Sequence, residues 1–119
     1  MVGFYLYMES SQTRPGQRAD LVSPWTAARR GGQCLKLYYT MYGSTMASLA
    51  IKLELSNGKN WFIFYKNGNQ GKVWKKGMGK IDVSMGLSYK LTIQGTVGQT
   101  GYSDIAIDDV YIDPGLCSK

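Results

Sequence analysis

The sequence predicts an all-β protein, specifically an antiparallel β-sandwich of jelly-roll type. Apolar and polar residues alternate along several short segments, as they do in strands with one face on a core. Gly, Asn, Pro and Ser separate these segments about every ten residues, a spacing typical of sandwiches and barrels. No segment shows helical periodicity, and a parallel α/β fold would need crossover helices. The 119 residues suit one domain, spanning positions 1–119.

The first half of the chain holds one especially clear strand pattern. In Cys34–Met41, four apolar or aromatic residues share one parity and polar residues occupy positions between them. Pro15-Gly16 predicts a turn before this pattern. The expected elements are a strand at Gly3–Met8, a short extended piece at Ala19–Pro24, a loop at Thr26–Gln33 and the strand at Cys34–Met41.

The second half completes a count of eight or nine strands. Leu49–Leu55 alternates without a break, and Asn57-Gly58 is a strong hairpin signal. The next strand is expected at Asn60–Lys66. The expected remainder is a turn at Asn67–Gly71, strand pieces at Val73–Lys76 and Gly79–Val83, a strand at Tyr89–Gly95, a loop at Thr96–Ser103 and a last strand at Asp104–Ile112.

Composition favours binding over catalysis. The chain has no His, which excludes Ser-His-Asp hydrolases, Cys-His proteases and His-ligated metal sites. It also lacks a Gly-x-Ser-x-Gly elbow, so we expect no enzyme. No nucleic-acid motif and no apolar stretch near the length of a membrane helix are present, so neither nucleic-acid binding nor membrane insertion is expected.

Two cysteines, Cys34 and Cys117, allow one intramolecular disulfide. A bridge closing so long a loop would stabilise the fold by roughly 4–5 kcal/mol in the chain-entropy model. The alternative is a pair of free buried thiols in a cytosolic protein.

Several motifs in order resemble the MAM domain family, an extracellular adhesion and interaction module of meprins, neuropilins and receptor tyrosine phosphatases. Each motif alone is weak, but their order and spacing along nearly the whole chain are specific. The motifs are Gly3–Tyr7 followed by Gly16–Pro24, then Gln33–Gly43, Leu49–Leu53, Gln70-Gly71 with Trp74, and Asp104–Val110 with Cys117 after it.

The resemblance implies a secreted or cell-surface protein whose domain mediates protein contact, homophilic adhesion or self-association. It also implies that Cys34 and Cys117 form the second, C-terminal disulfide of a four-cysteine framework. The family's acidic N-terminal segment and first disulfide have no counterpart here, so the domain is expected to be N-terminally short. An incomplete sandwich exposes strand edges, and we therefore expect self-association through strand exchange or addition.

Asp108 and Asp109 are candidate ligands for Ca²⁺ or another cation, by resemblance to the family's ion site. Carboxylate oxygens suit Ca²⁺, but adjacent residues of a regular strand point to opposite faces unless a bulge intervenes. The favoured alternative is that these carboxylates accept ordinary structural hydrogen bonds. No cofactor is certain.

The expected binding surface combines aromatic and basic residues. The three tryptophans and nine tyrosines could stack on sugars or a protein partner, although core packing is the favoured interpretation. Tyr38, Tyr42 and Tyr65 are the aromatic candidates for exposure. The lysines around Trp74 could bind heparin or another polyanion, although a solvated surface is the favoured explanation of the net charge of +6. Loops 42–48, 66–72 and 96–103 are expected to supply contacts. The candidate surface residues are Tyr42, Tyr65, Lys72, Lys75 and Lys76.

Three functions therefore remain open. The favoured one is a non-catalytic extracellular protein-interaction or adhesion module. The alternatives are a glycan- or polyanion-binding sandwich and a self-assembling secreted matrix protein.

Overall fold

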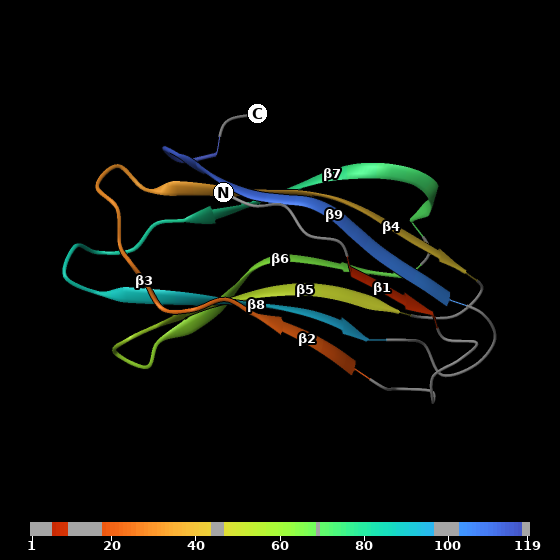
Figure 1. The fold of residues 1–119 in the computed structure, drawn as a ribbon, viewed down its shortest axis with the longest axis horizontal. Helices are drawn as coiled ribbons and strands as arrows, with labels where there is room; N and C mark the ends of the chain where they lie inside the picture. The colour runs from red at the N-terminus through yellow and green to blue at the C-terminus, as the bar shows by residue number, and fades with distance from the viewer. Residues whose placement is uncertain (1–5, 10–17, 44–46, 69, 97–102, 118–119) are drawn as a thin grey trace.

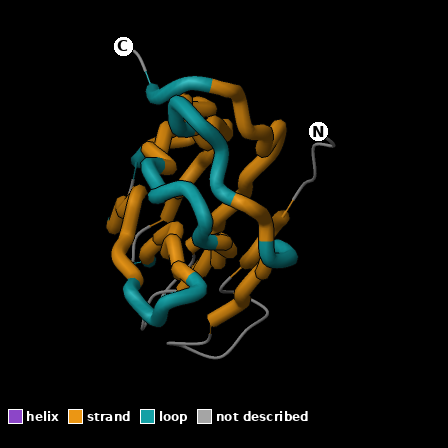
Figure 2. The backbone as a smooth tube through the Cα atoms, turned by 90° about the vertical axis from the view of Figure 1, so that its left-hand side faces the viewer, coloured by secondary structure: helices purple, strands orange, loops and turns teal. Residues whose placement is uncertain are grey.

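The computed structural model describes residues 6–9, 18–43, 47–68, 70–96 and 103–117, which contain nine strands and no helix. The strands form two antiparallel sheets that face each other as two layers (Figure 1). Viewed from the side, the described chain is likewise all strand and loop (Figure 2). The predicted all-β sandwich is confirmed.

The first sheet has the strand order β1-β9-β4-β7. Its two longest neighbours, β9 and β4, come from opposite ends of the chain and pair along most of their length. Such distant pairing is typical of Greek-key and jelly-roll connections. The strands are β1 (Leu6–Glu9), β4 (Gln33–Gly43), β7 (Gly71–Ile81) and β9 (Ser103–Pro114).

The second sheet has the order β2-β8-β5-β6, with β3 also paired to β8. Pro24 lies between β2 and β3 and cannot donate to a ladder. Ser23 bridges the gap, because its N–H donates to the Leu91 carbonyl at 2.9 Å and its Oγ accepts the Leu91 N–H at 2.8 Å. The strands are β2 (Arg18–Val22), β3 (Thr26–Ala27), β5 (Ser48–Leu55), β6 (Asn60–Asn67) and β8 (Ser88–Thr96). β3 corrects part of the predicted Thr26–Gln33 loop.

The core lies between the sheets and follows the predicted alternation. β4 and β5 each bury alternate residues, as the sequence pattern required. β8 and β9 add the matching positions of their own sheets. The main inward residues are Leu35, Leu37, Tyr39 and Met41 on β4, Leu49, Ile51, Leu53 and Leu55 on β5, Tyr89, Leu91 and Ile93 on β8, and Ile105, Ile107 and Val110 on β9.

One predicted element is wrong in outline. The pieces Val73–Lys76 and Gly79–Val83 are one continuous strand, β7, of 11 residues. Gly77 and Gly79, which look like strand breakers, instead lie within it, opposite Leu37 and Leu35 of β4. Glycine inside a strand often marks a close approach of another backbone.

That close approach is to β6, the edge strand of the other sheet. A Cβ on Gly77 would lie 2.6 Å from the Phe64 ring, and one on Gly79 would lie 2.8 Å from Ile63 Cδ1 and 3.2 Å from the Ile63 carbonyl. A bulge in β6 lets Ile63 and Phe64 both face β7, since Ile51 pairs with Phe64 whereas Lys52 pairs with Phe62. The two sheets therefore meet along one side of the sandwich, where β6 contacts β7.

Candidate functional site

Among the residues predicted as a binding surface, the two tyrosines lie on opposite outer faces of the sandwich. Tyr42 lies on the outer face of the first sheet, with 44% of its surface exposed. Tyr65 lies on the outer face of the second sheet, opposite Ala50, and is 55% exposed. Lys75 and Lys76 are exposed on β7, and Lys76 lies on the outer face of the first sheet, opposite Tyr38 of β4. Lys72 belongs to β7, but its side chain lies outside the described residues. In the predicted contact loops, residues 44–46, 69 and 97–102 also lie outside the described residues.

The outer face of the first sheet carries a row of unlike charges around a tyrosine. Tyr38 on β4 pairs with Lys76 on β7 on one side and with Asp108 on β9 on the other. Tyr38 is 38% exposed, Lys76 is exposed and Asp108 is half-buried. We call this Lys76–Tyr38–Asp108 set the charged row. Neighbouring strands lie about 4.8 Å apart, so the backbones of Lys76 and Asp108 are separated by roughly 10 Å.

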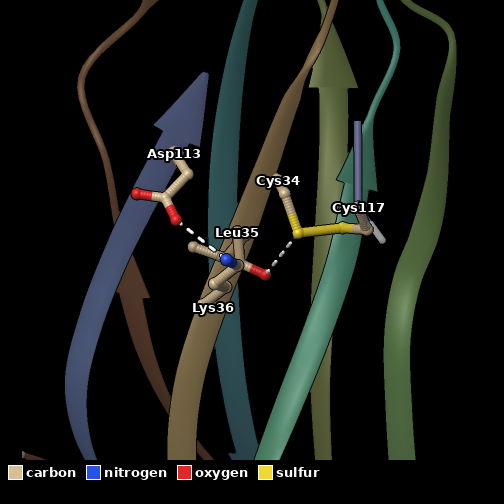
Figure 3. A network of polar contacts seen from close by, with 5 residues as sticks. All are labelled: Cys34, Leu35, Lys36, Asp113 and Cys117. Atoms are coloured by element: carbon tan, nitrogen blue, oxygen red, sulfur yellow. Dashed lines mark hydrogen bonds and ion pairs between the residues drawn. A yellow bond between two sulfur atoms is a disulfide. The ribbon is translucent and has the colours of Figure 1, made fainter. Parts of the chain in front are cut away.

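The predicted disulfide is confirmed at the end of this face. Cys34 and Cys117 are joined with an S–S distance of 2.07 Å and a Cα–Cα distance of 4.8 Å. Beside it, the Lys36 ammonium donates to Asp113 Oδ2 at 2.8 Å (Figure 3). This hydrogen bond raises the pKa of Lys36 above its ordinary value. The disulfide therefore anchors the chain end over β4, next to a cross-strand ion pair.

A bulge in β9 determines where the adjacent aspartates point. Lys36 pairs with Tyr111 but Tyr38 pairs with Asp108, which leaves one extra residue on β9. Asp109 takes the left-handed conformation there, with φ of 51°, and its N–H donates to Asp108 Oδ1 at 2.8 Å. The residues on either side of the pair, Ile107 and Val110, are buried, so both carboxylates lie outside the core.

The two aspartates have no third ligand among the residues that the structure describes. Within those ranges, no group of three or more His, Cys, Asp or Glu side chains is arranged to hold a metal ion. Asp109 is exposed, and Asp108 is engaged by the backbone of its neighbour. A cation at Asp108 and Asp109 stays a prediction, and the hydrogen bond that Asp108 accepts fits the structural alternative.

The side of the sandwich where β6 meets β7 is rich in exposed aromatic and basic residues. We call this surface the β6–β7 edge. Its exposed aromatic residues are Trp61, Phe62 and Tyr65 on β6 and Trp74 on β7. Its exposed lysines are Lys66 on β6 and Lys75, Lys76 and Lys80 on β7.

Core packing is therefore the wrong interpretation for the tryptophans. Trp25, Trp61 and Trp74 are 52%, 41% and 45% exposed. Trp25 precedes the two-residue strand β3, and the other two lie on β6 and β7, each an edge strand of its sheet. Lys90 lies over the Trp25 ring at 5.1 Å from its centroid. The predicted exposure of Tyr38, Tyr42 and Tyr65 is confirmed.

Comparison with known families decides what kind of domain this is. The sequence profile of the family described as "MAM domain, meprin/A5/mu" matches residues 1–118. The chain belongs to the MAM domain family. In this MAM domain, the motif strands Gln33–Gly43 and Asp104–Val110 lie on β4 and β9, which pair at the centre of the first sheet. Their apolar positions are buried, so these motifs supply much of the core.

Curated relatives cover nearly all of this MAM domain. Neuropilin-1 of Xenopus laevis is 32% identical over 121 residues, covering 97% of the chain and 13% of that protein. Thyroid hormone-induced protein B of Xenopus laevis is 33% identical, covering 98% and 17%. The human MAM domain-containing glycosylphosphatidylinositol anchor protein 1 is 32% identical, covering 98% and 12%. The chain thus spans between about a tenth and a sixth of the length of these relatives.

Solved structures with the same fold are carbohydrate-binding modules. TmCBM61 in complex with β-1,4-galactotriose has a TM-score of 0.60 at 18% identity, over 94% of the chain and 68% of that structure. A structure titled "CBM4 structure and function" has a TM-score of 0.51 at 18% identity, over 92% and 70%. At this identity the likeness establishes the sandwich fold alone. No helix in the described residues of this MAM domain is long and apolar enough to cross a membrane.

Sequence reasoning missed the charged row. The sequence predicts Asp108 as a cation ligand or a structural hydrogen-bond acceptor, and Lys76 as part of a basic strip around Trp74. Their relation to Tyr38 depends on the registers of three strands that are far apart in the chain. The parity of Lys36, Tyr38 and Tyr42 on β4 could have shown that they share a face, but not which charges flank them.

Proposed function

We propose that this MAM domain is a non-catalytic, extracellular protein-interaction and adhesion module. Family membership supports it, and the Cys34–Cys117 bridge fits a secreted or cell-surface location, where disulfides persist. A rigid sandwich with tyrosines exposed on its outer face suits contact with a protein, because aromatic side chains are enriched in interfaces.

The observation that carries a homophilic version of this function is the charged row. Its positive end is on β7, its tyrosine is on the central strand β4, and its negative end is on β9. Such a face is self-complementary for one relative orientation only. A copy turned by 180° about an axis parallel to β4 puts its Lys76 opposite Asp108 of the first copy, and its Tyr38 opposite Tyr38.

The other in-plane two-fold axis, perpendicular to β4, would put β7 on β7 and lysine opposite lysine. Like charges across an interface are costly, so the row selects the parallel axis. Two-fold interfaces use the same patch on both copies, which this arrangement satisfies. Because Cys117 is attached at Cys34, the contact is centred on the other half of the face, at Tyr38 and Tyr42.

Charge exchange tests this contact. We expect Lys76→Glu and Asp108→Lys each to abolish self-association, because each places like charges together twice in the two-fold pair. An equimolar mixture of the two variants should recover a heterodimer, since every facing pair is then of unlike charge. Sedimentation equilibrium of each variant and of the mixture measures this. A wild-type chain that stays monomeric at high concentration, or a mixture that does not associate, contradicts the homophilic proposal.

A second candidate function is glycan binding. It is favoured by exposed aromatic residues on both outer faces and at the β6–β7 edge, together with the fold shared with the module solved with β-1,4-galactotriose. A glycan array probed with the wild-type domain tests it. Binding that disappears in Tyr42→Ala or Tyr65→Ala, with the fold intact, supports the function, and an array without any binding contradicts it.

A further inference from the structure

The net charge of the chain is confined to one segment. Between Ser56 and Ile81 there are six lysines and no acidic residue. The chain has 14 basic and eight acidic residues in all, so outside this segment eight basic residues balance eight acidic ones. The segment also contains five aromatic residues: Trp61, Phe62, Phe64, Tyr65 and Trp74. The excess of +6 therefore belongs to β6, β7 and the turns beside them.

The fold brings the two strands of this segment into contact. Gly77 and Gly79 allow β7 to lie against Phe64 and Ile63 of β6, across the side where the two sheets meet. Two residues from Phe64 and from Gly77, in the direction of the β6–β7 connection, the strands carry Lys66 and Lys75. Both lysines are exposed. Each strand of the edge therefore carries an exposed lysine beyond the point where the two strands pack together.

The lysines of the edge make no ion pair within the described residues, although Asp82 lies two positions from Lys80 in the chain. The four lysines Lys66, Lys75, Lys76 and Lys80 form no ion pair with any described residue, whereas Lys36 pairs with Asp113 and Lys52 with Glu54 on the outer faces of the sheets. On β7, Lys76 and Lys80 share the outward parity and lie about 13 Å apart along the strand. The positive charge therefore runs along the edge and is not concentrated at one point.

The residue types indicate a polymer and not a folded protein as the occupant. All six cations of the segment are lysines, and every arginine of the chain precedes position 31. Protein interfaces are enriched in Arg and depleted in Lys. Lysine is a compact, mobile charge suited to sulfate and phosphate groups at several positions. Flat exposed rings such as Trp74 and Tyr65 can cover the apolar face of a sugar ring. Contact of the edge with the same edge of a second copy is disfavoured because lysines would face lysines.

We infer that the β6–β7 edge binds a sulfated polysaccharide lengthwise, with Lys66, Lys75 and Lys80 contacting its sulfates and Trp74 stacking on a sugar ring. The inference rests on the second candidate function above and names its ligand class and site. The proposed homophilic contact does not depend on this inference, because the three lysines lie outside the charged row.

Immobilised heparin is the probe, and two triple variants of equal net charge test the site. The edge variant is Lys66→Gln with Lys75→Gln and Lys80→Gln. The matched control is Arg29→Gln with Arg30→Gln and Lys90→Gln, which removes the same charge from elsewhere. We expect the edge variant to bind heparin at least about tenfold more weakly, with the slope of log Kd against log NaCl reduced by about two to three. The control should remain within about twofold of wild type.

The remaining measurements distinguish the ligand classes. Trp74→Ala should weaken heparin binding several-fold without changing the salt slope, since it removes a stacking contact and no charge. Equal losses in the edge and control variants, no heparin binding by wild type, no effect of Trp74→Ala, or equally tight binding to duplex DNA or poly-glutamate would each overturn the inference. Failure here together with binding to neutral glycans on the array leaves the second candidate function standing, whereas an array without binding removes both.

Discussion

Tyr89 is a single side chain that links the two sheets. It lies on β8 in the second sheet, is 1% exposed, and its hydroxyl donates to Gln33 Oε1 at 2.6 Å, at the start of β4 in the first sheet. Burial raises the pKa of Tyr89 above its ordinary value, more than the nearby Arg29 charge and the Gln33 contact lower it. Burial alone raises the pKa of Tyr39 in the same way. Both residues are therefore held neutral by the fold.

This shift makes stability depend on alkaline pH. Above about pH 10, the ordinary pKa of tyrosine, the unfolded chain releases protons that the folded chain still holds. These two tyrosines should therefore leave the free energy of unfolding unchanged below pH 10. Above pH 10 they should lower it, as the pH rises through the pKa values that they have in the folded protein. In Tyr89→Phe that fall should be smaller, although the lost hydrogen bond lowers stability by about 1 kcal/mol at pH 8. Urea unfolding at pH 8 to 11 measures both effects, and an unchanged alkaline slope in the variant contradicts the assignment.

Exposure of single aromatic residues is where sequence reasoning was weakest. Alternation correctly identified Tyr39 and Tyr89 as core residues, because both lie on strands with neighbours on each side. The same reasoning predicted that Trp61 and Trp74 pack in the core, which is wrong. Whether a strand lies at an edge depends on the pairing of the whole sheet, which no local pattern reports.

Among the elements, β6 and β7 depend most on glycine. A methyl group at Gly79 would meet the Ile63 side chain at 2.8 Å and its backbone oxygen at 3.2 Å. Backbone cannot yield as a side chain does, so we expect Gly79→Ala to separate the two strands and lower the free energy of unfolding by about 1–3 kcal/mol. Urea denaturation at neutral pH measures this.

A double variant separates this clash from a simple preference of the strand for glycine. Ile63→Ala removes the two nearest side-chain atoms, so in the Gly79→Ala background it should recover part of the lost stability, whereas alone it should be destabilising. Strictly additive losses would show that β6 and β7 do not press together at this point.

Local pattern predicted most elements and few registers. The unbroken alternation of Leu49–Leu55 and the Asn57-Gly58 turn defined the β5–β6 hairpin, which the structure reproduces. Two bulges, at Ile63 on β6 and Asp109 on β9, were not predicted, because a bulge is defined by the partner strand that it opposes. β7 was divided at its glycines for a related reason, since Gly77 and Gly79 are explained only by β6 across the sandwich.

For the whole molecule, composition gave the size of the net charge but not its place. The six lysines are spread over 26 positions in sequence, and the strands that carry five of them, β6 and β7, meet only in the folded sandwich. The residues of the charged row lie even further apart in the sequence, since Lys76, Tyr38 and Asp108 come from three separate strands. Both candidate surfaces thus depend on topology, whereas the family motifs encode mainly the core.

The disulfide tests how strongly the chain ends hold this topology together. Cys34 and Cys117 are separated by 83 residues and connect the start of β4 to the segment after β9. Constraining a loop of this size in the unfolded chain is worth roughly 4–5 kcal/mol, a large part of the 5–15 kcal/mol typical of a domain. We therefore expect Cys34→Ala with Cys117→Ala to lower the free energy of unfolding by about that amount while keeping a β-rich circular dichroism spectrum in water.

A phosphine reductant should shift the urea midpoint of the wild-type protein to that of the double variant and leave the variant itself unchanged. Because β4 and β9 also hold each other through a long ladder and the Lys36–Asp113 pair, a loss below about 1 kcal/mol would mean that these contacts already restrict the chain and that the bridge adds little.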